Sequence, residues 1–231
     1  ILQCGLHIGI DITIIKTHIF IYKDYINIFS LSFYSQSMAA FVLNGTRYIY
    51  EEGKRNISFE VTNNAEKTYG GQVWIDNHDQ GDEVYMVPQP PFFKVPAKQK
   101  QIIRIINTDT NLPKDRESLL WLNVQEVPPK PKTNDVEGSV LAIAMNTRVK
   151  LIYRPLSIKD GRKDAETQLK LVQRGSNTLL KNPTPYYIAI VNVKHAGKDV
   201  SLSNNVMNEV SQLKPYSEVN LGKKVSGKVS V

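Results

Sequence analysis

The sequence contains almost no cysteine. Cys4 is the only cysteine in 231 residues, so the chain cannot form an internal disulfide. Cys4 also lacks the spaced cysteine and histidine neighbours of a zinc site. The four histidines lie far apart and show no metal-ligand spacing; they are His7, His18, His78 and His195. We therefore expect neither a metal nor another cofactor.

Motifs that carry catalysis are also missing. The sequence has no GxSxG nucleophile motif, no glycine-rich phosphate loop and no cysteine–histidine candidate after residue 40. Neighbouring carboxylates such as Glu51 and Glu52 fall in expected turns, where charged side chains are usually solvated. We therefore expect that the protein is not an enzyme.

Acidic residues are fewer than basic residues. The sequence has 22 Asp and Glu residues against 29 Lys and Arg residues, which gives a formal net charge of +7. Such an excess suits nucleic acid, an anionic membrane surface or an acidic protein partner. The cations are scattered and form no dense block interleaved with aromatic residues, so a solvated basic surface is the better interpretation. We expect no nucleic-acid binding.

No apolar run reaches the ~18 uninterrupted residues of a membrane span, so stable membrane insertion is not expected. The stretch INIFSLSFYSQSMA, which starts at Ile26, is a short apolar run that ends in small residues. Ser37 and Ala39 are spaced like a signal-peptidase site, and Lys23 lies upstream as a cationic flank. We interpret residues 1–39 as a leader or signal-peptide region, with a disordered leader as the alternative. A signal would place the mature protein, from about Ala40, outside the cytoplasm.

Short alternating segments separated by turn residues follow the leader. Strands are expected in residues 46–50, 56–63, 70–76, 102–106 and 118–127, with residues 88–101 as a proline-rich connection. Ile57, Phe59 and Val61 would share one strand face. Many short strands with little helical periodicity predict an all-β fold of the immunoglobulin-like sandwich type.

The Arg154-Pro155 pair predicts a stiff hinge between two domains, because proline restricts its own backbone and that of the preceding residue. The expected domains are residues 40–154 and residues 155–231. Strands of the second domain are expected in residues 167–172, 182–193 and 209–213. Residues 155–231 are fewer than the roughly 100 of a complete sandwich, so we expect this domain to be truncated.

The stretch VLAIAMNTRVKLIYRP, residues 140–155, combines an apolar alternating strand with cations at its base. Leu141, Ile143 and Met145 share one face of an extended strand. The simplest interpretation is the last strand of a sandwich with one buried face. The alternative is an exposed apolar edge beside a cationic cleft that binds a carboxylate or phosphate. Strict alternation places Lys150 on the face opposite Leu141, unless a twist or bulge intervenes between Met145 and Val149.

Three segments carry a family resemblance. LPKDRESLLWLNVQEVPPKP, VLAIAMNTRVKLIYRP and NPTPYYIAI resemble the periplasmic pilus chaperones of the chaperone–usher pathway. The similarity runs from about residue 40 to residue 231. It implies two immunoglobulin-like β-sandwich domains in a boomerang arrangement, with the second domain incomplete. It also implies a periplasmic protein.

The resemblance implies that the protein binds pilin subunits by donor-strand complementation and delivers them to an outer-membrane usher. The donor side chains would be Leu141, Ile143 and Met145. Arg47 and Lys150 would anchor the C-terminal carboxylate of the subunit. An exposed apolar edge also leaves self-association through the donor strand open.

Two further residues match the interdomain salt bridge of the family, Glu117 in DRES and Arg154 in YRP. An ordinary surface ion pair is the alternative for these two residues. The short polar loop from Lys130 to Ser139 and the lack of a cysteine pair indicate the branch with a short loop between the last two strands of the first domain. The alternative function is an immunoglobulin-like surface adhesion or structural module that binds other proteins.

Overall fold

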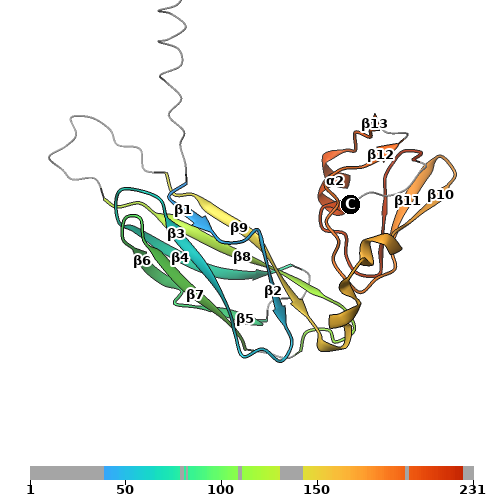
Figure 1. The fold of residues 1–231 in the computed structure, drawn as a ribbon. Helices are drawn as coiled ribbons and strands as arrows, with labels where there is room; N and C mark the ends of the chain where they lie inside the picture. Colours follow the sequence, from blue (N-terminus) through green and yellow to red (C-terminus); the bar gives the residue numbers. More distant parts are fainter. Residues whose placement is uncertain are drawn as a thin grey trace, which may run out of the picture. The chain divides into compact units, whose positions relative to one another are not determined.

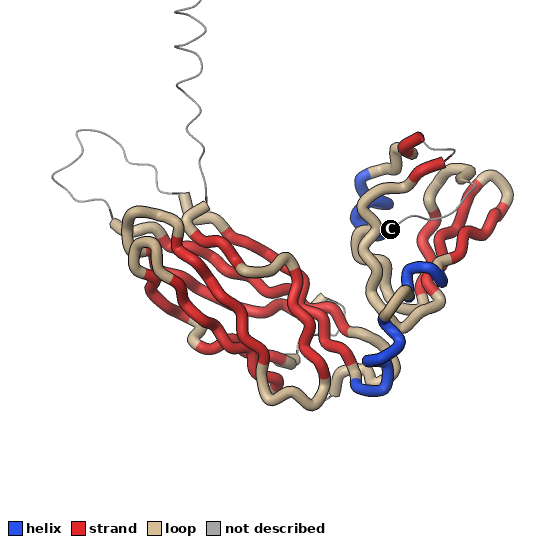
Figure 2. The backbone as a smooth tube through the Cα atoms, in the orientation of Figure 1, coloured by secondary structure: helices blue, strands red, loops and turns tan. Residues whose placement is uncertain are grey.

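The computed structural model describes residues 39–78, 81, 83–108, 111–130, 143–195 and 198–225. In this part of the chain β-strands predominate and helices are few and short (Figures 1 and 2). Buried apolar residues form two separate clusters, one before and one after the expected hinge. The structure therefore has the all-β architecture with two cores that the sequence predicts.

The first domain consists of two sheets (Figure 1). The four-stranded sheet has the order β1 (Phe41–Leu43), β3 (Ile57–Asn63), β7 (Lys100–Asn107) and β5 (Met86–Gln89). The five-stranded sheet has the order β2 (Arg47–Glu51), β9 (Asn146–Arg154), β8 (Ser118–Val127), β4 (Tyr69–Asn77) and β6 (Phe92–Val95). Every neighbouring pair in these two sheets is antiparallel except β2 and β9, which run parallel.

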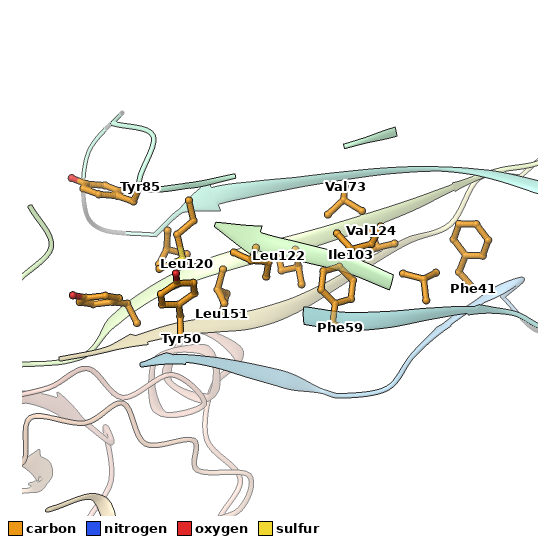
Figure 3. Packing of buried hydrophobic residues seen from close by; sticks show 14 of the residues in the cluster. Phe41, Tyr50, Phe59, Val73, Tyr85, Ile103, Leu120, Leu122, Val124 and Leu151 are labelled. Carbon is orange, nitrogen blue, oxygen red and sulfur yellow. The ribbon is translucent and has the colours of Figure 1, made fainter. Parts of the chain in front are cut away.

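Alternation along each strand builds the first core. On β8, Leu120, Leu122 and Val124 point into the space between the two sheets, and Phe59 and Ile103 of the opposite sheet belong to the same core, as Figure 3 shows. All five side chains are almost completely buried. Each large apolar side chain buried in this way contributes about 1.5–3 kcal/mol to the free energy of folding. The core therefore fixes which face of β8, and of its neighbour β9, points inward.

The prediction that residues 88–101 form a proline-rich connection is wrong, because this segment contains the end of β5 and all of β6. Both strands lie at the edge of a sheet. An edge strand has one side without a partner, so a proline that lacks an N–H group is tolerated there. The sequence pattern alone did not reveal this edge position.

The second domain contains a sheet of β10 (Lys170–Arg174), β11 (Asn177–Asn182) and β14 (Ser217–Asn220), and a small pair of β12 (Lys194–His195) and β13 (Lys198–Asp199). Two 3-10 helices, η2 (Leu156–Arg162) and η3 (Ala165–Gln168), precede the sheet, and η2 follows Pro155 directly. The helix α2 (Asn204–Val210) begins at Ser203, whose side chain accepts a hydrogen bond from Val206 N. This side chain satisfies one of the unpaired N–H groups at the helix start.

Three strand predictions in the second domain are wrong in whole or part. β10 starts at Lys170, after η3, so the start expected at residue 167 is too early. Of residues 182–193, Asn182 ends β11, and the rest contribute only an isolated bridge between Ile188 and Leu213, although Ile188 and Ile190 are buried. Residues 209 and 210 belong to α2 and form no strand. The Ser203 cap and the burial of Val210 stabilise the helix here, and both outweigh the weak alternating pattern that predicted a strand. The strands β11 and β14 were not predicted.

The leader over residues 1–38, the loop over residues 131–139 and Leu141 lie outside the described residues. None of the helices in the described part of the chain has the length and apolarity that crossing a membrane requires.

Candidate functional site

The strand β9 lies between β2 and β8, and this placement builds the candidate site. Lys150 is paired with Arg47 of β2 on one side and with Trp121 of β8 on the other. Directly paired residues of neighbouring strands have side chains on the same face of a sheet. Arg47, Lys150 and Trp121 therefore form one cross-strand row.

β2 covers only the second half of β9. The parallel pairing with β2 runs from Lys150 to Arg154, whereas the antiparallel pairing with β8 already starts at Asn146. Among the described strands, none pairs with the other edge of β9 between Asn146 and Val149. The N–H and C=O groups of this edge are the kind that accept an added strand.

The register of β9 is regular. Its pairing with β8 is continuous from Asn146 to Tyr153, and Glu126 N donates to Met145 O at 3.0 Å, which extends the same register by one residue. No bulge lies between Met145 and Val149, so strict alternation holds over this segment. Val149 packs against the first core, and Lys150 therefore lies on the opposite, outer face.

The apolar residues before β9 are exposed. Ile143 is 63% exposed and Met145 is 45% exposed, although both follow the same alternation as the core-facing Val149. Leu151 and Tyr153, farther along, are completely buried in the first core. This stretch thus has an exposed apolar part before β9 and a buried part in the second half of β9.

Lys150 is half-buried, and its Nζ donates to the carbonyl oxygen of Ser211 at 2.6 Å, just after the end of α2. Burial lowers the pKa of Lys150 below its usual value, and the nearby charge of Arg47 lowers it further. Within the described part of the chain, no Asp or Glu forms an ion pair with Arg47 or Lys150. A half-buried cation without a counter-ion is suited to an anionic ligand.

A cavity of about 230 Å³ opens beside this row. Its lining residues come from the start of β2, from β8 and β9, and from the second domain; they are Thr46, Arg47, Trp121, Arg148, Val149, Lys150 and Ala189. The volume is small compared with the 300–1,000 Å³ of typical ligand pockets. The cavity therefore fits the end of a chain or a small group better than a large cofactor.

Glu117 connects the two domains. Its Oε1 lies 2.7 Å from Nε of Arg154, and its Oε2 accepts a hydrogen bond of 2.8 Å from Tyr187 N. Glu117 is 2% exposed, and burial raises the pKa of its carboxyl group above the usual value, against the opposing effect of Arg154. The pair is thus a buried ion pair and differs from the solvent-exposed pair considered as the alternative.

Sequence reasoning missed two groups of residues near the site. One is the stack of Arg148 on Trp121, with 4.4 Å between the guanidinium carbon and the ring centroid. The other is an ion-pair cluster around the hinge, formed by Glu51 with Lys159 and by Glu52 with Lys114. Both depend on contacts between residues distant in sequence, and no local pattern indicates them. Among the described residues, no group of three His, Cys, Asp or Glu side chains is placed to hold a metal ion.

Comparison with known families assigns both domains. Residues 40–159 match the model described as pili and flagellar-assembly chaperone, PapD N-terminal domain. Residues 164–231 match the model described as pili assembly chaperone PapD, C-terminal domain. Together the two models span most of the chain.

Similar proteins carry the same assignment. Chaperone protein FanE of Escherichia coli is 50% identical over 212 residues, which are 90% of this chain and 92% of that protein. Chaperone protein FaeE of Escherichia coli is 40% identical over 187 residues, 79% of this chain and 70% of that protein.

Solved structures agree with these relatives. The structure of Salmonella enterica SafA pilin in complex with the SafB chaperone matches with a TM-score of 0.68 and 26% identity, over 81% of this chain and 85% of that one. The YadV chaperone structure matches with a TM-score of 0.64 and 32% identity, over 84% of this chain and 88% of that one.

Proposed function

The chain belongs to the family of pilus-assembly chaperones with PapD N-terminal and C-terminal domains, and from this premise we propose that it binds pilin subunits by lending them a β-strand. The lent strand comprises residues 141–145 and the first half of β9. The chaperone then delivers the subunit to an outer-membrane usher. It acts by binding, with no catalytic step.

One observation carries the proposal: the exposed apolar edge before and along the first half of β9 leads to Lys150, which lies opposite Arg47 of β2, and no described Asp or Glu forms an ion pair with either cation. Ile143 and Met145 are exposed, and the β9 edge facing away from β8 has no described partner before Lys150. A strand added to this edge would gain main-chain hydrogen bonds, and the alternating apolar side chains would fill pockets of the guest. Leu141 continues the same alternation and is proposed as a third donor residue.

The cation pair indicates where the guest strand ends. β2 begins at Arg47, opposite Lys150, so a strand added to the free edge of β9 must stop there. A guest C-terminal carboxylate is ionised at neutral pH and would accept hydrogen bonds from Arg47 and Lys150. In this placement the guest strand runs toward Lys150 in the same direction as β9, and therefore pairs with it in parallel.

The anchor also sets the register of the guest. If the guest carboxylate is fixed at Lys150, the distance from this anchor to Met145 and Ile143 along the strand is also fixed. Each of these two side chains then meets one particular pocket of the guest. A shift of one residue would turn every guest side chain to the wrong face. We propose this as the reason for combining a charged anchor with an apolar edge.

Glu117 and Arg154 are proposed to hold the two domains in the arrangement that keeps the site open. The hydrogen bond from Tyr187 N to Glu117 supports this role, because it joins a residue of the second domain to a residue of the first domain. The domains are proposed as residues 40–154 and 155–231, and the protein is proposed to act in the periplasm. Self-association through the free donor edge is proposed for the unloaded chaperone.

The test is co-purification of a pilin subunit with the chaperone from the periplasm. Lys150→Ala is expected to reduce the recovered subunit at least tenfold, because the guest carboxylate loses a charge-assisted hydrogen bond in a partly buried site. Lys94→Ala, which removes an exposed lysine from β6, is the matched control and is expected to change nothing. Circular dichroism of each variant checks that the fold is kept.

Equal recovery of the subunit with Lys150→Ala and with the unchanged protein would contradict the proposal. Retention of the protein on the cell surface, with no effect of either Arg47 or Lys150 substitutions, would instead indicate an adhesion or structural module.

A further inference from the structure

The cavity beside Lys150 contains a third cation that a single carboxylate does not need. Arg148 precedes Lys150 by two residues on the regular strand β9, so both side chains lie on the same outer face. Arg148 lines the same cavity as Arg47 and Lys150. Two residues of strand span about 6.6 Å, so Arg148 and Lys150 can contact two neighbouring groups of one ligand.

Arg148 is held in place by aromatic stacking. Its guanidinium carbon lies 4.4 Å from the ring centroid of Trp121, and the indole Nε1 of Trp121 donates to Nδ1 of His78 at 3.3 Å. A guanidinium stacked on an indole ring keeps its N–H donors free in the plane of the group. Arg148 thus presents an ordered, planar set of N–H donors to the cavity.

The charges around the cavity are unbalanced. Of the described residues that line it, three are cationic and none is acidic. No described Asp or Glu forms an ion pair with Arg148, just as none does with Arg47 or Lys150. One terminal carboxylate would neutralise a single positive charge and leave the others uncompensated. A ligand with a second negative group would match the cavity better.

We propose that Arg148, stacked on Trp121, is a second anion-binding position, and that the cavity prefers a guest chain end with a negative side chain beside its terminal carboxylate. This inference rests on the proposed function, because it assumes that a guest chain ends at Arg47 and Lys150. Arg148 then determines specificity, while Arg47 and Lys150 recognise the chain end itself.

The test uses the full chain and synthetic peptides of about ten residues from the C-terminal strand of a pilin subunit. Four forms combine Asp or Asn as the last residue with a terminal carboxylate or carboxamide. Dissociation constants are measured by calorimetry at constant ionic strength. The unchanged protein is expected to bind the Asp form about fivefold more tightly than the Asn form, as for a solvent-accessible ion pair.

Arg148→Gln is expected to abolish the Asp preference and to keep the preference for carboxylate over carboxamide. Trp121→Leu is expected to weaken the Asp preference in the same way, because Arg148 loses its stacking partner. Arg104→Gln, at an exposed arginine of β7 in the other sheet, is the matched control and is expected to keep both preferences. Arg148→Lys keeps the charge without the planar donors and is expected to retain part of the Asp preference.

Two results would overturn the inference: no Asp preference in the unchanged protein, or a full Asp preference in Arg148→Gln. Failure of the proposed function gives a different result, since the unchanged protein would then bind the carboxylate and carboxamide forms equally.

Discussion

Two buried asparagines, one in each domain, end a strand and hold the loop that follows it. Asn63 ends β3 and is completely buried, and Asn182 ends β11 and is 1% exposed. The side-chain amide of Asn63 donates to the carbonyl groups of Lys67, Val95 and Pro96, and its oxygen accepts from Ala65 N. The amide of Asn182 bonds in the same manner to Tyr186 O, Lys214 O and Thr184 N. Polar groups in these positions stabilise the fold only because each has a partner.

The residue-scale prediction concerns Asn63. Asn63→Ala is expected to lower the free energy of unfolding by about 2–4 kcal/mol, because several buried carbonyl groups and one N–H lose their partner. Asn56→Ala, at an exposed asparagine just before β3, is the matched control and is expected to stay within about 0.5 kcal/mol of the unchanged protein. Urea denaturation followed by tryptophan fluorescence measures both values. Equal stability of the two variants would show that the Asn63 hydrogen bonds contribute little.

Some single residues could be interpreted from the sequence only in part. Gly70 and Gly71 were expected to start a strand, whereas both lie inside β4. A Cβ atom on Gly71 would approach Cζ of Phe93 to 2.3 Å, and the ring of Phe93 stacks on that of Phe41 at 5.8 Å. The glycine thus makes room for two aromatic rings from other strands. Its role depends on long-range packing, which alternation in one segment does not specify.

At the scale of elements, β9 combines two environments that its sequence pattern does not separate. Its second half is covered by β2 on one edge and buried on one face, whereas its first half lacks β2. The parallel pairing of β2 with β9 joins residues about one hundred positions apart and could not be predicted from local pattern.

The strands β3, β4, β7 and β8 alternate clearly and were predicted within a few residues. The edge strands of the proline-rich segment and the helix α2 were not predicted from the sequence. Their local sequence has only a weak preference for strand or helix, and their position in the folded domain decides which one forms.

The element-scale prediction concerns the exposed half of the donor edge. Ile143→Glu is expected to reduce pilin recovery at least tenfold, because a charged side chain would enter an apolar pocket of the guest. Ile143 is 63% exposed, so the free energy of unfolding is expected to change by less than about 0.5 kcal/mol. Ile102→Glu is the matched control, since Ile102 is 57% exposed on β7 of the other sheet, and is expected to keep pilin recovery.

Sedimentation of the purified Ile143→Glu variant tests the same edge without a guest. If the free donor edge mediates self-association, the variant is expected to sediment as a smaller species than the unchanged protein. Unchanged pilin recovery and unchanged sedimentation together would exclude Ile143 from the binding edge.

At the scale of the whole molecule, the junction between the domains is polar. Glu117 contacts Arg154 and Tyr187, while Glu52 accepts hydrogen bonds from Lys114 Nζ and from Leu156 N at the start of η2. Arg154 also lies over the ring of Tyr186, at 5.9 Å from the centroid. Buried ionic contacts give weak net stability but strongly disfavour arrangements in which they are broken. Such a junction is suited to fixing one arrangement of the domains, and the sequence indicated only the Glu117–Arg154 part of it.

The whole-molecule prediction follows from the raised pKa of Glu117. Because folding disfavours the ionised carboxyl group, this group stabilises the fold most below its unfolded pKa, which is about 4.5. Its contribution falls as the pH rises from there through the raised pKa of the folded state. Glu117→Gln keeps an acceptor for Tyr187 N but cannot ionise. The free energy of unfolding of the unchanged protein, relative to Glu117→Gln, is therefore expected to decrease across this pH range.

Comparing Glu117→Ala with Glu117→Gln separates the hydrogen bonds of Glu117 from its charge. Glu117→Ala is expected to lower the free energy of unfolding by about 3 kcal/mol at neutral pH, because buried Arg154 and Tyr187 N both lose their partner. Asp115→Asn, at an exposed carboxylate paired with Arg116, is the control and is expected to show little change in stability. Urea denaturation from pH 4 to pH 8 measures all three variants. A difference between Glu117→Gln and the unchanged protein that is constant over this range would mean that Glu117 titrates equally in the folded and unfolded states, and burial would then not control its charge.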